Sequence, residues 1–199
     1  MNTRKPRRDS DVLPSKFGHK ELLFKFLVIG DYGVGAVLFW IAIIVFPFIG
    51  KFTSNYKITI GADFAIKTID WDPFTKINLQ LWDVAGHERF GYITRVYYKY
   101  AVAAALVFDI SRIATFQSMK RWLTDLREKV ALPDGSNVPV VLLANKCDIP
   151  CPVVAVDQIA KFCKENDIGA WYVTSAKENT NVGKYICHFF NHSLIRRAT

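Results

Sequence analysis

The chain has 199 residues, which is enough for one domain with short extensions and too few for two full domains. Apolar residues make up 51% of the chain and charged residues 22%, so its composition is globular and excludes a disordered, collagenous or fibrous protein. Its 26 Lys and Arg residues exceed its 18 Asp and Glu residues, which gives a net charge of +8, and part of this excess lies in residues 1–20.

Residues 1–20 are interpreted as a disordered basic leader. Their positive charge is not interleaved with aromatic residues as it is in nucleic-acid-binding segments, so we expect no nucleic-acid partner. No apolar stretch follows Met1, and we therefore expect no secretory signal and a cytosolic setting.

Beyond residue 20, short apolar runs alternate with helical patterns, which is typical of strands joined by crossover helices around a mostly parallel sheet. Strands are expected at residues 22–29, 62–71, 77–84, 103–110, 138–144 and 170–173. Turn residues at 72–75 join the second strand to the third, so one antiparallel hairpin is expected. Helices are expected near residues 115–132, 156–166 and 182–194. The sequence thus predicts an α/β domain over residues 21–195, with a mixed six-stranded sheet, helices on both faces and a short tail at 196–199.

Three short polar motifs follow the ends of predicted strands, where an open α/β sheet binds its ligands. The first is DVAG at residues 83–86. The Asp83 carboxylate can hold Mg²⁺ through water, and Gly86 lets a backbone N–H approach a terminal phosphate because no Cβ is in the way. This motif predicts a phosphate and its metal at this edge of the sheet.

The second and third motifs predict a guanine pocket. NKCD at residues 145–148 follows an apolar strand, and the Asp148 carboxylate can accept two hydrogen bonds from adjacent N–H groups of guanine, which adenine does not offer. TSAK at residues 174–177 follows the last strand, and its Ala176 N–H is expected to donate to the guanine O6 atom. Three such motifs in order across one sheet are far more specific than any one polar loop.

In these three motifs the chain resembles the Ras superfamily of small GTPases, and within it the Rab family of vesicle-traffic switches. Further matching stretches are IGDYGVG at residues 29–35, TIG at 59–61, WDVAGHERF at 82–90, TRVYYKYA at 94–101 and LVFDIS at 106–111. The resemblance spans nearly all of residues 20–195 and implies a P-loop NTPase-like fold. The segments ADFAIKTIDWDP, LQLWDVAG and FCKEN look most like the Rab branch of melanosomes and other lysosome-related organelles.

The resemblance implies a GTP/GDP-binding switch that hydrolyses GTP with Mg²⁺ and regulates vesicle and organelle membrane trafficking from the cytosolic face of endomembranes. Its expected partners are an exchange factor, a GTPase-activating protein and trafficking effectors, which would contact the switch segments near Thr59 and residues 86–95. Thr59 and Asp83 would serve the Mg²⁺ ion. The implied nucleotide-binding residues are Gly30, Asp31, Gly33, Val34, Gly35, Thr59, Gly86, Asn145, Lys146, Asp148, Ser175, Ala176 and Lys177.

The phosphate loop departs from the family pattern after Gly35. The pattern G-x-x-x-x-G-K-[S/T] uses its Lys for the β and γ oxygens and its hydroxyl for Mg²⁺. In this chain Ala36 and Val37 follow the last glycine, and they supply neither a charge nor a hydroxyl. Weakened binding of GTP and Mg²⁺ is therefore expected.

Residues 36–50 form an atypical block that is apolar except for Pro47 and Gly50, where the family has a shorter helix with a polar face. One interpretation is a transmembrane helix, since residues 32–50 carry no charge, although the Gly and Pro residues weaken it. A second is a buried core helix, which would leave large apolar side chains exposed. The interpretation that we favour is a splice variant, an intron-derived stretch or a gene-model error that replaces the usual segment.

Position 87 and the C-terminal residues also depart from the family. His87 stands where the family has the Gln that orients the attacking water, so it is the candidate catalytic residue and slower GTP hydrolysis is expected. Rab proteins end in a tail with prenylated cysteines, whereas the last cysteine here is Cys187 within a predicted helix, so stable membrane anchoring is not expected. The alternative to a working switch is a variant, defective in its nucleotide cycle, that acts at most as a partner-binding module.

Overall fold

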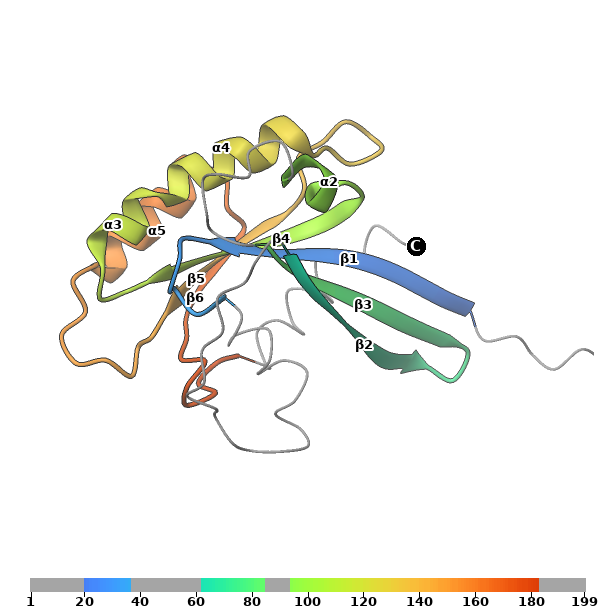
Figure 1. The fold of residues 1–199 in the computed structure, drawn as a ribbon, viewed down its shortest axis with the longest axis horizontal. Coiled ribbons are helices and arrows are strands. Elements are labelled where there is room, and N and C mark those ends of the chain that lie inside the picture. The colour runs from blue at the N-terminus through green and yellow to red at the C-terminus, as the bar shows by residue number, and fades with distance from the viewer. Residues whose placement is uncertain (1–19, 37–61, 85–93, 183–199) are drawn as a thin grey trace, which may run out of the picture.

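The computed structural model of the chain describes residues 20–36, 62–84 and 94–182. Its strands are β1 (Lys20–Gly30), β2 (Ala62–Asp72), β3 (Thr75–Val84), β4 (Ala101–Asp109), β5 (Val140–Asn145) and β6 (Ala170–Val173). They lie side by side in the order β2-β3-β1-β4-β5-β6 (Figure 1). β2 and β3 are antiparallel, whereas every other neighbouring pair is parallel, so the predicted mixed six-stranded sheet is confirmed.

The hairpin between β2 and β3 forms where the turn residues predict it. The Asp72 carboxylate accepts a hydrogen bond from the Phe74 N–H at 2.7 Å, which is the local side-chain contact that makes Asp a frequent turn residue. β3 then continues to Val84, so the first polar motif begins within the last residues of this strand.

Two apolar clusters bury the two faces of the sheet. Along β4 the side chains alternate between them: Ala104, Leu106 and Phe108 belong to one cluster, and Ala105 and Val107 belong to the other. This alternation follows from the two-residue period of a strand, and a parallel strand covered on both faces is apolar throughout. The continuous apolar runs of the sequence therefore correspond to central strands.

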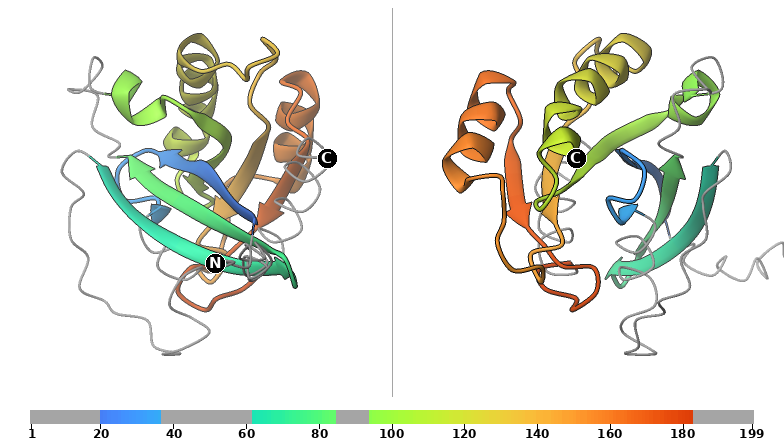
Figure 2. Two further views of the ribbon diagram at one scale, coloured as in Figure 1. Left: turned by 90° about the vertical axis from the view of Figure 1, so that its right-hand side faces the viewer. Right: turned by 60° about the vertical axis from the view of Figure 1, so that its left-hand side comes forward.

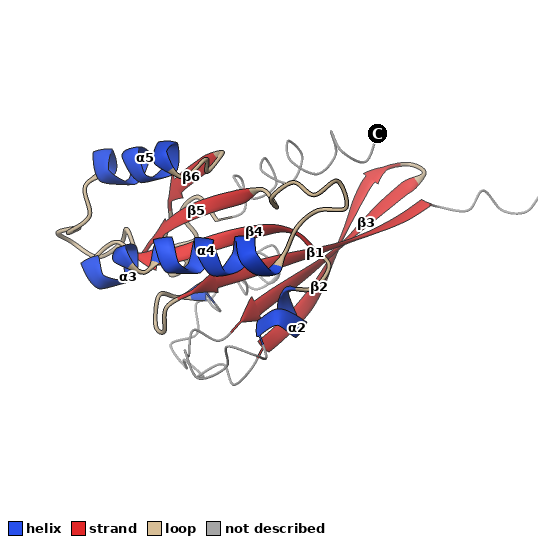
Figure 3. Ribbon diagram, turned by 90° about the horizontal axis from the view of Figure 1, so that it is seen from above, coloured by secondary structure: helices blue, strands red, loops and turns tan. Residues whose placement is uncertain are grey.

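The helices of the described part are α2 (Thr94–Tyr98), α3 (Ile113–Gln117), α4 (Met119–Lys129) and α5 (Val156–Glu165). They lie on one face of the sheet (Figures 1 and 2), and α2, α4 and α5 contribute side chains to the same apolar cluster. α4 lies over β4 and β1 (Figure 3). The side chains on the opposite face of the sheet form the second apolar cluster and are also buried.

The helix predicted at residues 115–132 is two helices, so its boundaries are wrong. α3 ends at Gln117, and α4 begins at Met119 after the single residue Ser118, whose N–H and hydroxyl both donate to the carbonyl of Ala114 at 3.1 Å. α4 ends at Lys129 because Val130 has extended backbone angles, with φ −137° and ψ 130°. The short helix α2 was not predicted.

None of the helices in the described ranges is long and apolar enough to cross a membrane. The leader up to residue 19, the apolar block from residue 37 onward, the predicted helix beyond residue 182 and the tail lie outside the described residues. The proposed domain limits therefore stay predictions.

Candidate functional site

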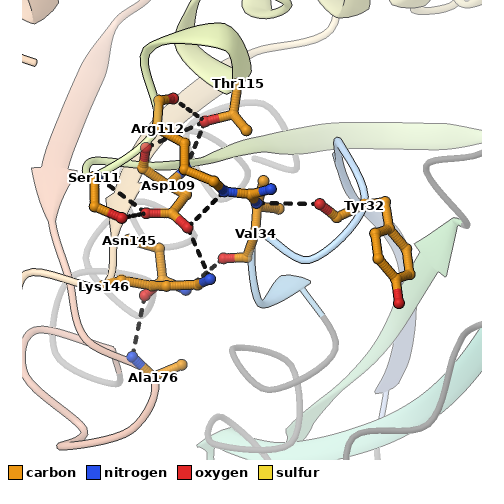
Figure 4. Close-up of polar contacts among 9 residues, drawn as sticks. All are labelled: Tyr32, Val34, Asp109, Ser111, Arg112, Thr115, Asn145, Lys146 and Ala176. Atoms are coloured by element: carbon orange, nitrogen blue, oxygen red, sulfur yellow. Dashed lines mark hydrogen bonds and ion pairs between the residues drawn. The ribbon is translucent and has the colours of Figure 1, made fainter. Parts of the chain in front are cut away.

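The loops that follow β1, β5 and β6 meet at one edge of the sheet, and the side chain of Asn145 joins all three. Its Nδ2 atom donates to the carbonyl of Val34 at 2.8 Å, and its Oδ1 atom accepts from the Ala176 N–H at 3.1 Å (Figure 4). The same Oδ1 atom accepts from the Thr174 hydroxyl at 3.3 Å. Asn145 is 1% exposed. Because a buried amide is costly unless its atoms are paired, these bonds fix the three loops relative to one another.

The loop at residues 30–35 needs its glycines. Gly33 and Gly35 have φ values of +74° and +87°, which residues with a side chain rarely adopt. A Cβ at Gly30 would stand 2.2 Å from the carbonyl oxygen of Val107, and one at Gly35 would stand 2.7 Å from Nδ2 of Asn145. The glycine pattern noted in the sequence is thus required both by backbone conformation and by close packing.

The side chain of Asp31 anchors this loop to α4. One carboxylate oxygen accepts from the indole N–H of Trp122 at 2.8 Å and from Arg121 at 3.5 Å. Asp31 was assigned to nucleotide binding by resemblance, and in the structure its side chain holds the loop in place.

The two predicted guanine loops lie together. The Asp148 side chain is 8% exposed; it accepts a hydrogen bond from the Ser175 hydroxyl at 2.6 Å and lies 3.8 Å from the Lys177 ammonium. The Cys147 N–H donates to the Thr174 carbonyl at 3.0 Å, which ties the loop after β5 to the loop after β6. Asp148 is therefore held in one orientation while retaining the acceptor capacity of a carboxylate.

Ala176 contacts Asn145 through its backbone, and its contact with guanine stays a prediction. Its N–H, expected to donate to guanine O6, donates to Asn145 in this structure. The geometry therefore gives Ala176 a role in fixing Asn145.

A charged cluster around Asp109 was missed in the sequence. The Asp109 carboxylate, 2% exposed, accepts from Lys146 at 2.8 Å, from Nε of Arg112 at 2.9 Å, and from both the hydroxyl and the N–H of Ser111 (Figure 4). Burial acts to raise the pKa of Asp109, but the hydrogen bonds from Lys146, Ser111 and Arg112 outweigh it and lower the pKa to about 2. The sequence feature that could have indicated this cluster is Asp109 itself, an acidic residue at the end of an apolar strand.

Lys146, which was assigned to the guanine pocket, is held by this cluster. Its φ of +67° places it in the left-handed region, and its ammonium lies on Asp109. Lys146 thus links the loop after β5 to the end of β4.

Asp83, the predicted Mg²⁺ ligand, is 2% exposed near the end of β3, in register with Val28 of β1. A carboxylate therefore stands beside the strand that leads into the glycine loop, and carboxylate oxygens suit Mg²⁺. Among the residues that the structure describes, no group of three or more His, Cys, Asp or Glu side chains is arranged to hold a metal ion. Thr59, Gly86 and His87 lie outside these residues.

The glycine loop, the Asn145 junction and the guanine loops lie in chain order along one sheet edge, and a family comparison agrees with this arrangement. The model of the Ras family matches residues 25–194. The chain belongs to the Ras family. Its curated relatives place it among the Rab proteins of that family.

Three of these relatives illustrate the similarity. Rab-32B of Dictyostelium discoideum is 46% identical over 176 residues, which cover 88% of this chain and 66% of the relative. Human Rab-32 is 51% identical over 165 residues, with 82% and 71% covered. Human Rab-7L1 is 43% identical over 167 residues, with 84% and 80% covered. These similarities support the prediction of a Rab-type small GTPase, which is a GTP-binding switch of membrane trafficking with hydrolase activity. They do not favour the alternative of a partner-binding module.

Proposed function

We propose that this Rab-type GTPase is a guanine-selective switch that acts on the cytosolic face of endomembranes of the lysosome-related type. The observation that carries the guanine assignment is the Asn145 junction, because it holds the glycine loop and the loop of Asp148 in one rigid arrangement. The organelle assignment is supported by similarity to the Rab-32 and Rab-7L1 branch. The proposed partners are an exchange factor, a GTPase-activating protein and effectors.

In this proposal, different residues bind the base and the phosphates of the nucleotide. Asp148, fixed by Ser175, accepts two hydrogen bonds from the guanine edge. The backbone of residues 30–35 faces the phosphates, and Mg²⁺, held by Asp83 through water and by Thr59, would neutralise phosphate charge when bound. The uncharged residues after Gly35 reduce the phosphate share of the binding energy, so the base contact carries more of it in this chain than in the family pattern.

Replacing Asp148 with Asn is expected to remove the preference for guanine over adenine nucleotides. The Asn amide keeps one acceptor oxygen, so one of the two hydrogen bonds to guanine is lost. A charge-assisted hydrogen bond contributes about 1.5–3 kcal/mol, so GDP affinity falls by about 10- to 100-fold while ADP affinity changes little. Competition of labelled GDP by GTP and by ATP measures the effect.

The control is Asp157→Asn, which removes a carboxylate from the exposed first turn of α5 and should leave competition unchanged. If ATP displaces labelled GDP from the native chain as effectively as GTP does, the proposed guanine selectivity is wrong.

A further inference from the structure

Arg112, which follows β4, contacts the glycine loop directly. Its Nη2 atom donates to the carbonyl of Tyr32 at 3.1 Å, while its Nε atom donates to Asp109 at 2.9 Å (Figure 4). The two terminal nitrogens of the guanidinium are the nearest atoms to the place of a Cβ on Gly33, at 3.6 and 3.9 Å. The guanidinium therefore packs against the loop while the buried carboxylate of Asp109 sets its direction.

The contact with Tyr32 determines where the next N–H points. In a trans peptide the carbonyl and the following N–H point in opposite directions, and the described residues contain no cis peptide bond. With the Tyr32 carbonyl turned toward Arg112, the Gly33 N–H points away from it. The Val34 carbonyl, turned toward Asn145, directs the Gly35 N–H in the same manner.

These two N–H groups are available to a ligand. Within the described ranges, neither the Gly33 N–H nor the Gly35 N–H donates to a protein acceptor. The Val34 N–H between them donates to the carbonyl of Asp31 at 3.4 Å. Backbone N–H groups of a glycine-rich turn that are not used within the protein can bind an anion. Arg112 thus fixes the Gly33 N–H through the Tyr32 carbonyl, and Asn145 fixes the Gly35 N–H through the Val34 carbonyl. Both donors are in place before a ligand binds.

We propose that Arg112 is a positioning residue for phosphate binding: through the Tyr32 carbonyl it holds the Gly33 N–H toward the diphosphate of a nucleotide. The inference rests on the proposed function, because it assigns Arg112 to the same nucleotide site. In a loop that is followed by Ala36 instead of a lysine, fixed backbone donors make up a larger share of the phosphate contacts.

The geometry distinguishes a positioning role of Arg112 from a purely electrostatic one. Arginine reaches two acceptors at once because its Nε and Nη2 atoms project in a rigid fork. A lysine keeps the charge, but its single ammonium cannot reproduce the fork between Asp109 and Tyr32. Arg112→Lys should therefore behave like Arg112→Ala, whereas a purely electrostatic role predicts recovery by lysine.

The test compares the full chain with Arg112→Ala, Arg112→Lys and the control Lys161→Ala, whose ammonium is exposed on α5 and pairs only weakly with Glu165 at 3.9 Å. Affinities for GDP, GMP and pyrophosphate are measured by titration calorimetry or displacement of a labelled nucleotide. We expect Arg112→Ala to weaken GDP and pyrophosphate by about tenfold and GMP by less than twofold, with Arg112→Lys within threefold of the alanine variant and the control unchanged.

The ratio of GMP to GDP affinity within one variant does not depend on how much of the protein is folded, so instability cannot imitate the result. An unchanged ratio, full recovery by lysine, or absence of both GDP and pyrophosphate binding in the native chain overturns the inference. If the native chain binds pyrophosphate in an Arg112-dependent way but does not prefer GDP to ADP, the positioning role stands and the proposed guanine switch fails.

Discussion

Placing Lys at position 36 and Thr at position 37 is expected to raise the affinity for GTP in Mg²⁺ by tens to thousands of fold. The glycine loop already has its backbone conformation, since Gly33 and Gly35 occupy the left-handed region and Asn145 holds the Val34 carbonyl. What the chain lacks is the ammonium for the β and γ oxygens and the hydroxyl for Mg²⁺. Each charge-assisted contact contributes about 1.5–3 kcal/mol, and about 1.4 kcal/mol corresponds to a factor of ten. Dissociation constants of the native and substituted chains measure the gain.

The matched control for this pair is Ala36→Gln alone, which adds a long side chain without a charge and should give little gain. Chelation of Mg²⁺ with EDTA is expected to weaken GTP binding by the substituted chain more than by the native chain, because the former gains a hydroxyl ligand at position 37 in addition to Thr59. Nanomolar binding of GTP by the native chain would show that the missing groups are not needed and would contradict this expectation.

The strands along the chain, and the meeting of the candidate motifs at one edge of the sheet, were predictable because each strand carries a local signal. The order of the strands within the sheet was not predicted, because it depends on pairing between distant segments. β4 and β5 are buried on both faces, so their sequences are apolar runs that end in the polar residues Asp109 and Asn145. The alternating pattern of the hairpin is equally local. Parallel neighbours then bring their carboxyl ends to one edge, which places the candidate motifs together without further information.

The Asp109 cluster could not be derived in the same way, because it depends on pairing between distant segments. Lys146 reaches Asp109 only because β4 and β5 are parallel in a register that sets Asp109 opposite Asn145. The contact between the Ala176 N–H and Asn145 has the same origin, since Asn145 ends β5 and Ala176 lies in the loop after β6. The boundary between α3 and α4 is one residue, Ser118, which the apolar pattern does not mark, and a helix of five residues such as α2 is too short to show a helical period.

Replacing Asp109 with Asn is expected to destabilise the domain by about 2–4 kcal/mol at pH 7. The native carboxylate is buried and neutralises both Lys146 and Arg112, and breaking a buried ion pair from one side leaves the opposite charges uncompensated. This loss of stability is somewhat smaller than is usual for a fully buried ion pair. The side chains of Lys146 and Arg112 are 31% and 45% exposed, so water partly replaces the lost carboxylate. Urea unfolding at pH 7 measures the change in the free energy of unfolding.

The same carboxylate makes stability depend on pH in a defined window. Because the folded-state pKa of Asp109 lies near 2, below its ordinary value of 3.8, its contribution is complete above about pH 4 and is lost as the pH falls through 2. The difference in unfolding free energy between the native chain and Asp109→Asn should therefore shrink between about pH 4 and pH 2. The control Asp70→Asn removes an 82% exposed carboxylate that lies 4.0 Å from Lys76, and it should change stability by no more than about 0.5 kcal/mol at either pH. A difference for Asp109→Asn that stays constant down to pH 2 would mean that the carboxylate is not stabilised by Lys146 and Arg112 in the folded state, and the coupling between the end of β4 and the two nucleotide loops would lose its electrostatic basis.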